Sequence, residues 1–179
     1  MVQRERIMSA EDIERSLTRI ALQILERNRG VSNIALVGIY TGGVHLANRI
    51  QKIIEAKEKI AVPAGSLDIT LYRDDWSLAA QNPVVKRTNI DFGIEGKAII
   101  LIDDVIFTGR TIRAAMDALM DFGRPLGVQL AVLVDRGGRE LPIQPDYTGL
   151  DVAVAANQHV HVLLKETADF EEVVLETHQ

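Results

Sequence analysis

Short runs of aliphatic residues alternate along this chain with segments whose apolar residues recur at helical spacing, and this alternation is the strongest constraint on the fold. Continuous apolar runs at Ile34–Ile39, Ala98–Ile102 and Val128–Val134 predict buried strands. Helical patterns follow the first two runs. Strands that alternate with helices are joined by right-handed crossovers, so the sequence predicts an α/β fold with a mainly parallel twisted sheet flanked by helices.

Three helices are predicted from periodicity and from their end signals. The first has Ser9 as N-cap with Asp12 three residues later, and Asn28-Arg29-Gly30 supplies its stop. The second follows the turn Thr41-Gly42-Gly43, and the third spans Thr111–Phe122. Further β-like segments are predicted at Ser66–Tyr72, near Val152, at His159–Leu164 and at Phe170–Leu175.

The composition agrees with a single unit built on such a sheet. The 179 residues suffice for one hydrophobic core, so we expect one domain over residues 1–179. Hydrophobic residues make up 47% and aromatic residues only 4%, which requires an aliphatic core. The chain has no cysteine, and this excludes disulfides, thiolate zinc sites and cysteine nucleophiles.

Charge and hydropathy limit the cellular compartments and the partners that we expect for this chain. The N-terminal segment is charged and has no apolar stretch, and no apolar run is long enough to span a bilayer. We therefore expect a cytoplasmic protein with no membrane partner. The net charge of −5 means that nucleic-acid binding would need a local basic patch.

Polar segments follow the predicted strands. Turns at residues 40–43, 103–111 and 135–140 come where parallel strands end, and ligands bind at that edge in open α/β sheets. The segment Arg73–Asn89 is polar and has no clean period, which is typical of a functional or mobile loop. These segments together predict one ligand site.

The run Ile99–Thr111 (IILIDDVIFTGRT) carries the strongest chemical signal. Asp103 and Asp104 follow a buried strand, where paired acids are costly unless a ligand hydrogen-bonds or neutralises them. A ribose diol with Mg²⁺ nearby would do so, and Thr108–Thr111 opens a helix whose N–H groups suit a phosphate. The alternatives are a helix cap and the acidic pocket of a receiver domain. Neither a Walker A nor a G-x-G-x-x-G pattern occurs.

The same run resembles the phosphoribosyl-diphosphate signature of type I phosphoribosyltransferases. Asp68–Asp75 (DITLYRDD) and Leu130–Pro142 (LAVLVDRGGRELP) are similar to the PyrR family, which joins attenuation of pyrimidine operons to uracil phosphoribosyltransferase activity. The resemblance runs from about residue 7 to about residue 165 and includes Leu17–Ile20 and Met116–Pro125. It implies the type I phosphoribosyltransferase fold, with a small β-rich C-terminal hood region.

The resemblance also implies roles for individual residues. Asp103 and Asp104 would bind the ribose hydroxyls as the catalytic residues, with Mg²⁺ carried by phosphoribosyl diphosphate beside them. The remaining predicted contacts are Thr41, Gly42 and Gly43 for diphosphate, Thr108, Gly109, Arg110 and Thr111 for the 5-phosphate, Val134, Asp135 and Arg136 for uracil, and a covering loop that begins with Tyr72, Arg73, Asp74 and Asp75.

One position bears on the base. Hypoxanthine-type enzymes usually have an acid before Thr-Gly, whereas this chain has Phe107, like the PyrR pattern. Phe107 either packs internally or contacts the base, and both readings stay open here. Because it carries no carboxylate, we expect a pyrimidine, with uracil as substrate and UMP or UTP as the sensed nucleotides.

The chain departs from the family pattern in two places. The diphosphate loop usually reads Thr-Arg-Gly, and with Gly42 it lacks a charge-assisted contact worth about 1.5–3 kcal/mol. We therefore expect weakened transferase activity, and arginine at position 42 should raise the affinity for phosphoribosyl diphosphate. The second departure concerns leader RNA, whose predicted contacts are Arg15, Thr18, Arg19, Arg27 and Arg139.

Part of the basic RNA face of the family is missing. Family histidines are replaced by Leu22 and Gly138, and basic residues by Gln144 and Asn157. Phosphate contacts carry most of the affinity, so their combined loss weakens RNA binding. We expect a homodimer or homotetramer that regulates pyrimidine genes through leader mRNA and makes UMP. The alternatives are a salvage-only enzyme and a catalytically weak UMP/UTP sensor, both without RNA binding.

Overall fold

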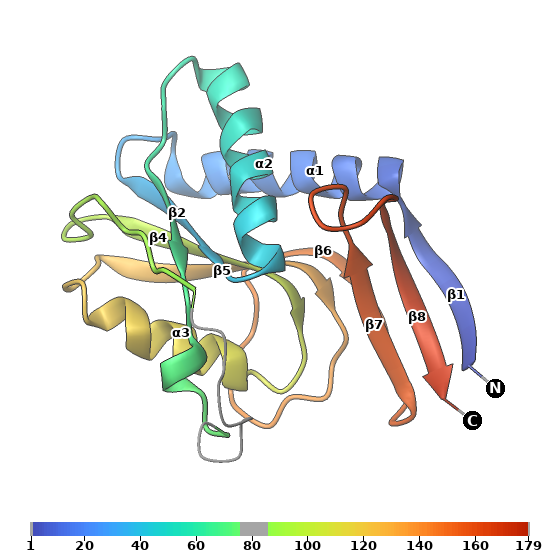
Figure 1. Cartoon of the computed structure of the whole chain (residues 1–179). Helices are drawn as coiled ribbons and strands as arrows, with labels where there is room; N and C mark the ends of the chain where they lie inside the picture. The colour runs from blue at the N-terminus through green and yellow to red at the C-terminus, as the bar shows by residue number, and fades with distance from the viewer. Residues whose placement is uncertain (1, 76–85, 179) are drawn as a thin grey trace.

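A computed structural model describes residues 2–75 and 86–178 of the chain. Its main layer is a five-stranded parallel sheet in the order β3-β2-β4-β5-β6. Helices α1 and α2 cover one face and α3 covers the other (Figure 1). The strands are β2 (Ile34–Ile39), β3 (Ala64–Leu67), β4 (Ala98–Ile106), β5 (Gly127–Asp135) and β6 (Tyr147–Asp151), and the helices are α1 (Ala10–Asn28), α2 (Gly42–Glu58) and α3 (Arg110–Met120).

Both faces of the parallel sheet are buried. Leu36 and Ile100 point toward α1 and α2, whereas Val37 and Leu101 on the same strands point toward α3. Neighbouring residues of a strand face opposite sides, so a strand covered on both sides must be apolar throughout. This explains the continuous aliphatic runs, and it confirms the predicted α/β fold with a mainly parallel sheet flanked by helices.

A second, antiparallel sheet stands beside the first. It has the order β1-β8-β7, and Val2 pairs with His178, so the two chain ends lie side by side (Figure 1). Its strands are β1 (Val2–Ser9), β7 (Gln158–Leu163) and β8 (Glu172–His178). This sheet is the small β-rich region expected from the resemblance. Strand β1 was not predicted, because its charged residues form a strand only through pairing with the far end of the chain.

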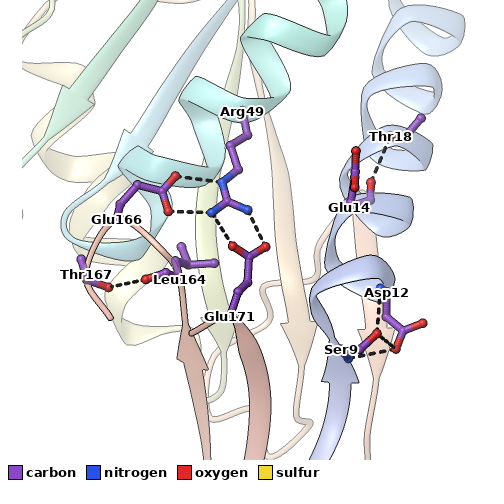
Figure 2. A network of polar contacts seen from close by, with 9 residues as sticks. All are labelled: Ser9, Asp12, Glu14, Thr18, Arg49, Leu164, Glu166, Thr167 and Glu171. Carbon is purple, nitrogen blue, oxygen red and sulfur yellow. Dashed lines mark hydrogen bonds and ion pairs between the residues drawn. The ribbon is translucent and has the colours of Figure 1, made fainter. Parts of the chain in front are cut away.

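The ends of α1 match their sequence signals. The Ser9 side chain accepts a hydrogen bond from the Asp12 N–H at 3.2 Å, and the Asp12 carboxylate accepts one from the Ser9 N–H at 2.9 Å (Figure 2). This reciprocal pair is a capping box. At the other end Arg29 adopts the left-handed conformation with φ 55°, and Gly30 follows with φ 108°. The predicted start and stop of this helix are confirmed.

Two predicted strand boundaries were wrong. β3 ends at Leu67, and Thr70–Tyr72 forms a 3₁₀ turn instead of continuing the strand. The Asp68 carboxylate accepts a hydrogen bond from the Thr70 N–H at 2.9 Å, and this local bond turns the chain. β4 continues past Ile102 to Ile106, because it stays paired with β5. Asp103 and Asp104 therefore lie within a strand and not in a following turn.

Smaller shifts occur elsewhere. α2 begins at Gly42, inside the segment predicted as a turn, and the last tail strand runs from Glu172 to His178. No helix within residues 2–75 and 86–178 is long and apolar enough to cross a membrane. The expectation of one domain over residues 1–179 stays a prediction.

Arg49 of α2 links the parallel sheet to the small sheet. Its guanidinium contacts Glu166 at 2.6 Å and Glu171 at 2.7 Å, and both acids lie in the connection between β7 and β8 (Figure 2). Glu171 has a side chain only 6% exposed. Hydrogen bonds from Arg49 lower the pKa of Glu166 to about 2 from its ordinary 4.5. This partly buried ion-pair network links the small sheet to α2.

Replacing Glu166 with glutamine should lower the free energy of unfolding by about 1 kcal/mol at pH 7, after discounting for a side chain that is about a third exposed. Its pKa is lower in the folded state, so its contribution is present above pH 4.5 and is lost as the pH falls toward 2. Urea unfolding at a series of pH values measures the difference.

Glu11→Gln is the matched control, because Glu11 pairs with Arg15 on the surface and its side chain is 78% exposed. We expect this control to change stability very little. A Glu166→Gln loss that is the same at pH 7 and pH 3 would contradict the assignment to the ion pair.

Candidate active site

The sheet order places a crevice at the carboxyl ends of β2 and β4. These two strands are neighbours, but β2 leads into α2 on one face while β4 leads into α3 on the other. Ligands of open α/β sheets bind where the connections diverge in this way. A cavity of about 410 Å³ lies there, lined by residues 40–42, 68–70, 103–105 and 111 and by Arg73 and Lys86. The first two predicted polar turns therefore meet in one site.

Asp103 and Asp104 lie on β4 at the floor of this cavity. Asp103 is 6% exposed, and burial together with the neighbouring charge of Asp104 raises its pKa well above the ordinary value. Burial also raises the pKa of Asp104. Among the ion pairs formed by residues 2–75 and 86–178, none includes either acid. A ligand that donates hydrogen bonds or carries a cation would compensate this pair.

The oxygen atoms available in the site suit a Mg²⁺ ion that takes part of its coordination shell from a bound ligand. In the described part of the chain, no group of three or more acidic, histidine or cysteine side chains could hold a metal by itself. The two carboxylates supply hard oxygen atoms of the kind Mg²⁺ prefers, and Mg²⁺ usually completes its shell with water and substrate phosphates. Asp103 and Asp104 are therefore the residues that would face such an ion.

Two helices begin at the crevice without a side-chain cap. α2 starts after Thr41 and α3 starts after Gly109, and within residues 2–75 and 86–178 neither N-cap residue makes a side-chain cap hydrogen bond. Gly109 has φ 92°, a conformation that favours glycine. Helix N-termini carry partial positive charge and N–H groups without an intrahelical partner. At the start of α3 the Thr108 hydroxyl accepts a hydrogen bond from the Arg110 N–H at 3.2 Å. The site therefore has two places for anionic groups, one on each side of the acids.

Glycines allow α2 to pack directly on β4. A Cβ at Gly43 would overlap the carbonyl oxygen of Ile102 and lie 3.1 Å from the Asp103 Cα. At Gly42 a Cβ would lie 2.8 Å from the Asp104 Cγ, so the Asp104 side chain occupies the space beside this loop. An arginine at position 42 would require the Asp104 side chain to rotate. The expected weakening of transferase activity by Gly42 stays a prediction.

The segment 108–111 and the start of the predicted covering loop lie together. The Arg110 guanidinium contacts Asp74 at 2.8 Å and Glu140 at 2.7 Å, and Asp74 also contacts Arg113 at 2.6 Å. A second cavity of about 250 Å³ lies between residues 73–75 and residues 108–111. The Arg110 side chain is thus engaged by acids, and phosphate binding by residues 108–111 stays a prediction.

The Tyr72 side chain points away from the site, because its hydroxyl donates a hydrogen bond to Asp121 just after α3. The structure therefore brings Arg73, Asp74 and Asp75 to the site and leaves Tyr72 outside it. Residues 76–85 of the expected covering loop, including Trp76, lie outside the described residues.

The predicted uracil-pocket residues differ in what they offer. Val134 is fully buried in the core, so only its backbone is available. The Asp135 carboxylate accepts a hydrogen bond from the Gly137 N–H at 2.9 Å and pairs with Arg139. The Arg136 guanidinium lies 4.0 Å from the centre of the Phe107 ring, and its buried Nε has no hydrogen-bond partner among the described residues. Phe107 packs under this cation and stays 45% exposed.

The predicted RNA contacts already have internal partners. Arg15 pairs with Glu11 and Arg27 pairs with Asp146, whereas Arg19 donates to the carbonyl oxygens of residues 148 and 149. The Thr18 hydroxyl donates to the Glu14 carbonyl oxygen at 2.9 Å (Figure 2).

Arg139 differs from these exposed residues. Its side chain is 13% exposed and is held by Asp135 and by the carbonyl oxygens of Phe107 and Ile143. This arrangement stabilises the loop after β5 and leaves the guanidinium poorly placed for RNA. RNA contact by the surface residues of α1 stays a prediction.

Lys86 was missed by the sequence analysis. Its Nζ donates a hydrogen bond to the Thr41 hydroxyl at 3.0 Å, and its side chain lines the cavity that holds the two acids. In the sequence Lys86 is one lysine within a polar segment that predicts a covering loop. A contact that spans 45 residues leaves no local pattern.

A family model described as "Phosphoribosyl transferase domain" matches residues 3–166. The fold and the site thus define a phosphoribosyltransferase. "Bifunctional protein PyrR" of Caldicellulosiruptor bescii is 54% identical over 170 residues, covering 95% of this chain and 93% of that protein. "Bifunctional protein PyrR" of Deinococcus deserti is 50% identical over 169 residues, covering 94% and 92%. The chain belongs to the PyrR family.

Solved structures agree on the fold. A hypoxanthine phosphoribosyltransferase of Trypanosoma cruzi superposes with a TM-score of 0.72 at 15% identity, covering 98% of this chain and 97% of that one. A hypoxanthine-guanine phosphoribosyltransferase of Bacillus anthracis gives a TM-score of 0.65 at 21% identity, covering 85% and 84%. Likenesses at this level of identity show the fold alone.

Proposed function

We propose that this chain transfers ribose 5-phosphate from phosphoribosyl diphosphate to uracil, and that it also regulates pyrimidine genes by binding their leader mRNA when UMP or UTP is present. We place it in the cytoplasm as a homodimer or homotetramer. The observation that carries the enzymatic part is the pair of Asp103, which is buried, and Asp104, which form no ion pair within residues 2–75 and 86–178 and lie between the N-termini of α2 and α3. Membership of the PyrR family supports both parts.

The shape of the site suits phosphoribosyl diphosphate. A ribose diol donates two hydrogen bonds, and we assign Asp103 and Asp104 to these hydroxyls. The 5-phosphate is assigned to the N–H groups of residues 108–111 at the start of α3, and the diphosphate to residues 41–43 at the start of α2. The two anionic groups of one molecule then occupy the two positive ends.

In the reaction, the bond from ribose C1 to the diphosphate oxygen breaks, the bond from C1 to uracil N1 forms, and N1 loses its proton. The chain contributes by holding the ribose against Asp103 and Asp104 and by excluding water that would hydrolyse the ribosyl centre. A Mg²⁺ ion bound with the substrate would neutralise the departing diphosphate beside these acids.

The base preference rests on Phe107 and Arg136. An exposed ring backed by a guanidinium stands where hypoxanthine-type enzymes usually have an acid. Position 107 offers an apolar surface and no carboxylate to a purine ring, and this favours a pyrimidine.

An assay of nucleotide formation tests the enzymatic part. Purified chain is incubated with phosphoribosyl diphosphate, Mg²⁺ and radiolabelled uracil, hypoxanthine or guanine in parallel. We expect UMP from uracil and no purine nucleotide. Formation of IMP or GMP instead of UMP would contradict the proposed substrate, and no product with any base would leave a nucleotide sensor without turnover.

The regulatory part has a competing alternative, because the predicted RNA arginines have internal partners and four family side chains are absent. A salvage enzyme without RNA binding would show this pattern. A gel shift with pyrimidine-leader RNA, run at several salt concentrations with and without UMP, separates the two. We expect a UMP-dependent, salt-sensitive shift, and its absence at low salt would favour the salvage enzyme.

A further inference from the structure

The diphosphate loop of this chain has no basic side chain of its own, since residue 42 is glycine. In the folded chain, a basic side chain from another segment lies beside this loop. The Lys86 Nζ donates a hydrogen bond to the Thr41 hydroxyl at 3.0 Å and lies 5.2 Å from the centre of the Tyr40 ring. We propose that Lys86 binds the diphosphate group of phosphoribosyl diphosphate, as a positioning residue for the leaving group. This inference rests on the proposed function.

The backbone around Lys86 is tied to the edge of the parallel sheet. Its N–H donates a hydrogen bond to the Asp68 carboxylate, directly after β3. Thr88 accepts a hydrogen bond from the Asp68 N–H at 3.0 Å, and Ser66 and Asn89 form a two-bond bridge at 2.8 and 2.9 Å. Lys86 is therefore anchored next to a strand, which is the way precise binding groups are supported.

The charge of Lys86 is available to an anion. Among the ion pairs of residues 2–75 and 86–178, none includes Lys86. Arg73, the other basic residue lining the cavity, is held by Asp75 through two hydrogen bonds of 2.8 Å. The partner of Lys86 is a neutral hydroxyl, and a phosphate oxygen forms a stronger, charge-assisted bond.

The position of Lys86 also fits the helix beside it. Thr41 is the N-cap residue of α2, which lacks a side-chain cap, so the Lys86 ammonium stands at the positive end of that helix. Two positive groups at one point, the Lys86 ammonium and the start of α2, favour an anion of high charge such as diphosphate. The segment assigned to the 5-phosphate lies at the start of α3, and the side-chain hydrogen bond of Lys86 found among the described residues goes to Thr41 instead.

This separation leads to a differential test. Phosphoribosyl diphosphate and inorganic diphosphate contain the group that Lys86 binds, whereas UMP lacks it. For Lys86→Gln we expect the Kd of Mg²⁺-phosphoribosyl diphosphate and of Mg²⁺-diphosphate to rise at least tenfold, while the Kd of UMP changes less than twofold. Lys86→Arg keeps the charge and should stay within threefold of the unsubstituted chain for all three.

The measurements are isothermal titrations, with thermal unfolding to compare the fold of each variant. Lys57→Gln is the matched control for charge, because Lys57 is an exposed residue in the last turn of α2, at the end away from the site. It should leave all three Kd values unchanged.

The possible results distinguish a failure of the Lys86 assignment from a failure of the proposed function. An unsubstituted chain that binds neither UMP nor phosphoribosyl diphosphate contradicts the proposed function and removes the basis of the inference. If that chain binds both, an unchanged Kd for phosphoribosyl diphosphate in Lys86→Gln contradicts the inference alone. Equal weakening of UMP and phosphoribosyl diphosphate also contradicts it, since a general disturbance of the site would do that.

Discussion

Replacing Asp103 with asparagine is expected to raise the melting temperature of the unliganded chain at neutral pH while lowering kcat/KM for UMP formation about 10²–10³-fold. Burial and the adjacent Asp104 charge raise the pKa of Asp103, so the folded state disfavours its charged form. Asparagine has the same shape and no charge, so it removes the cost of burying a charged group. It also removes the negative charge that we assign to the ribose hydroxyls and to the Mg²⁺ ion beside them.

The sign of the stability effect follows from linkage. Because the folded-state pKa is above the ordinary value of 3.8, the cost of Asp103 appears as the pH rises above that value and is complete above the raised pKa. The gain from asparagine should therefore be largest near pH 7.5 and shrink as the pH approaches 4. Each kcal/mol corresponds to about 2–4 °C for a chain of this size.

Scanning calorimetry across this pH range, with the UMP assay on the same samples, measures both effects. Asp169→Asn is the control, because Asp169 is an exposed acid in the connection between β7 and β8. It should change neither quantity. An Asp103→Asn chain that melts lower than the unsubstituted chain and keeps its activity would contradict both the burial cost and the assigned role.

Replacing Gly43 with alanine is the second change with a large expected effect. The added Cβ would overlap the Ile102 carbonyl oxygen and lie 3.1 Å from the Asp103 Cα, and neither backbone atom can move aside cheaply. The start of α2 must therefore shift away from β4, and we expect a loss of about 2–3 kcal/mol in the free energy of unfolding. The same shift displaces residues 41–43, which we assign to diphosphate, from the acids, so activity should fall as well.

Gly127→Ala is the matched control for this prediction. Gly127 begins β5 and has nothing within 4 Å of where its Cβ would lie, so alanine there should cost little. Urea unfolding of the two variants compares them directly. Equal stabilities would show that the close contact between α2 and β4 does not constrain residue 43.

The fold was predictable to the extent that its signals are local. Helix α1 follows from apolar periodicity and from a capping box within four residues, and the doubly covered strands follow from unbroken aliphatic runs. Strand β1 carries no such signal, because its exposed charged residues become a strand only by pairing with β8. The extension of β4 to Ile106 likewise depends on its pairing with β5.

The site residues also fall into those that have a local sequence signal and those that only folding brings together. Asp103 and Asp104 could be predicted together with residues 108–111, the segment assigned to phosphate, because the two sets are close in the sequence and are joined by one strand and one turn. Lys86 could not, because its contact with Thr41 is made by folding. The acidic partners of Arg27 and Arg110 are also distant in sequence, so their engagement could not be anticipated.

The central claim is that the chain holds ribose 5-phosphate between Asp103, Asp104 and the start of α3, and a crystal structure of the chain with bound UMP tests it most directly. The prediction is that the two ribose hydroxyls donate hydrogen bonds to the Asp103 and Asp104 carboxylates, while the phosphate accepts from the N–H groups of residues 108–111. A nucleotide bound with its phosphate away from residues 108–111, or with its ribose away from both acids, would contradict the account.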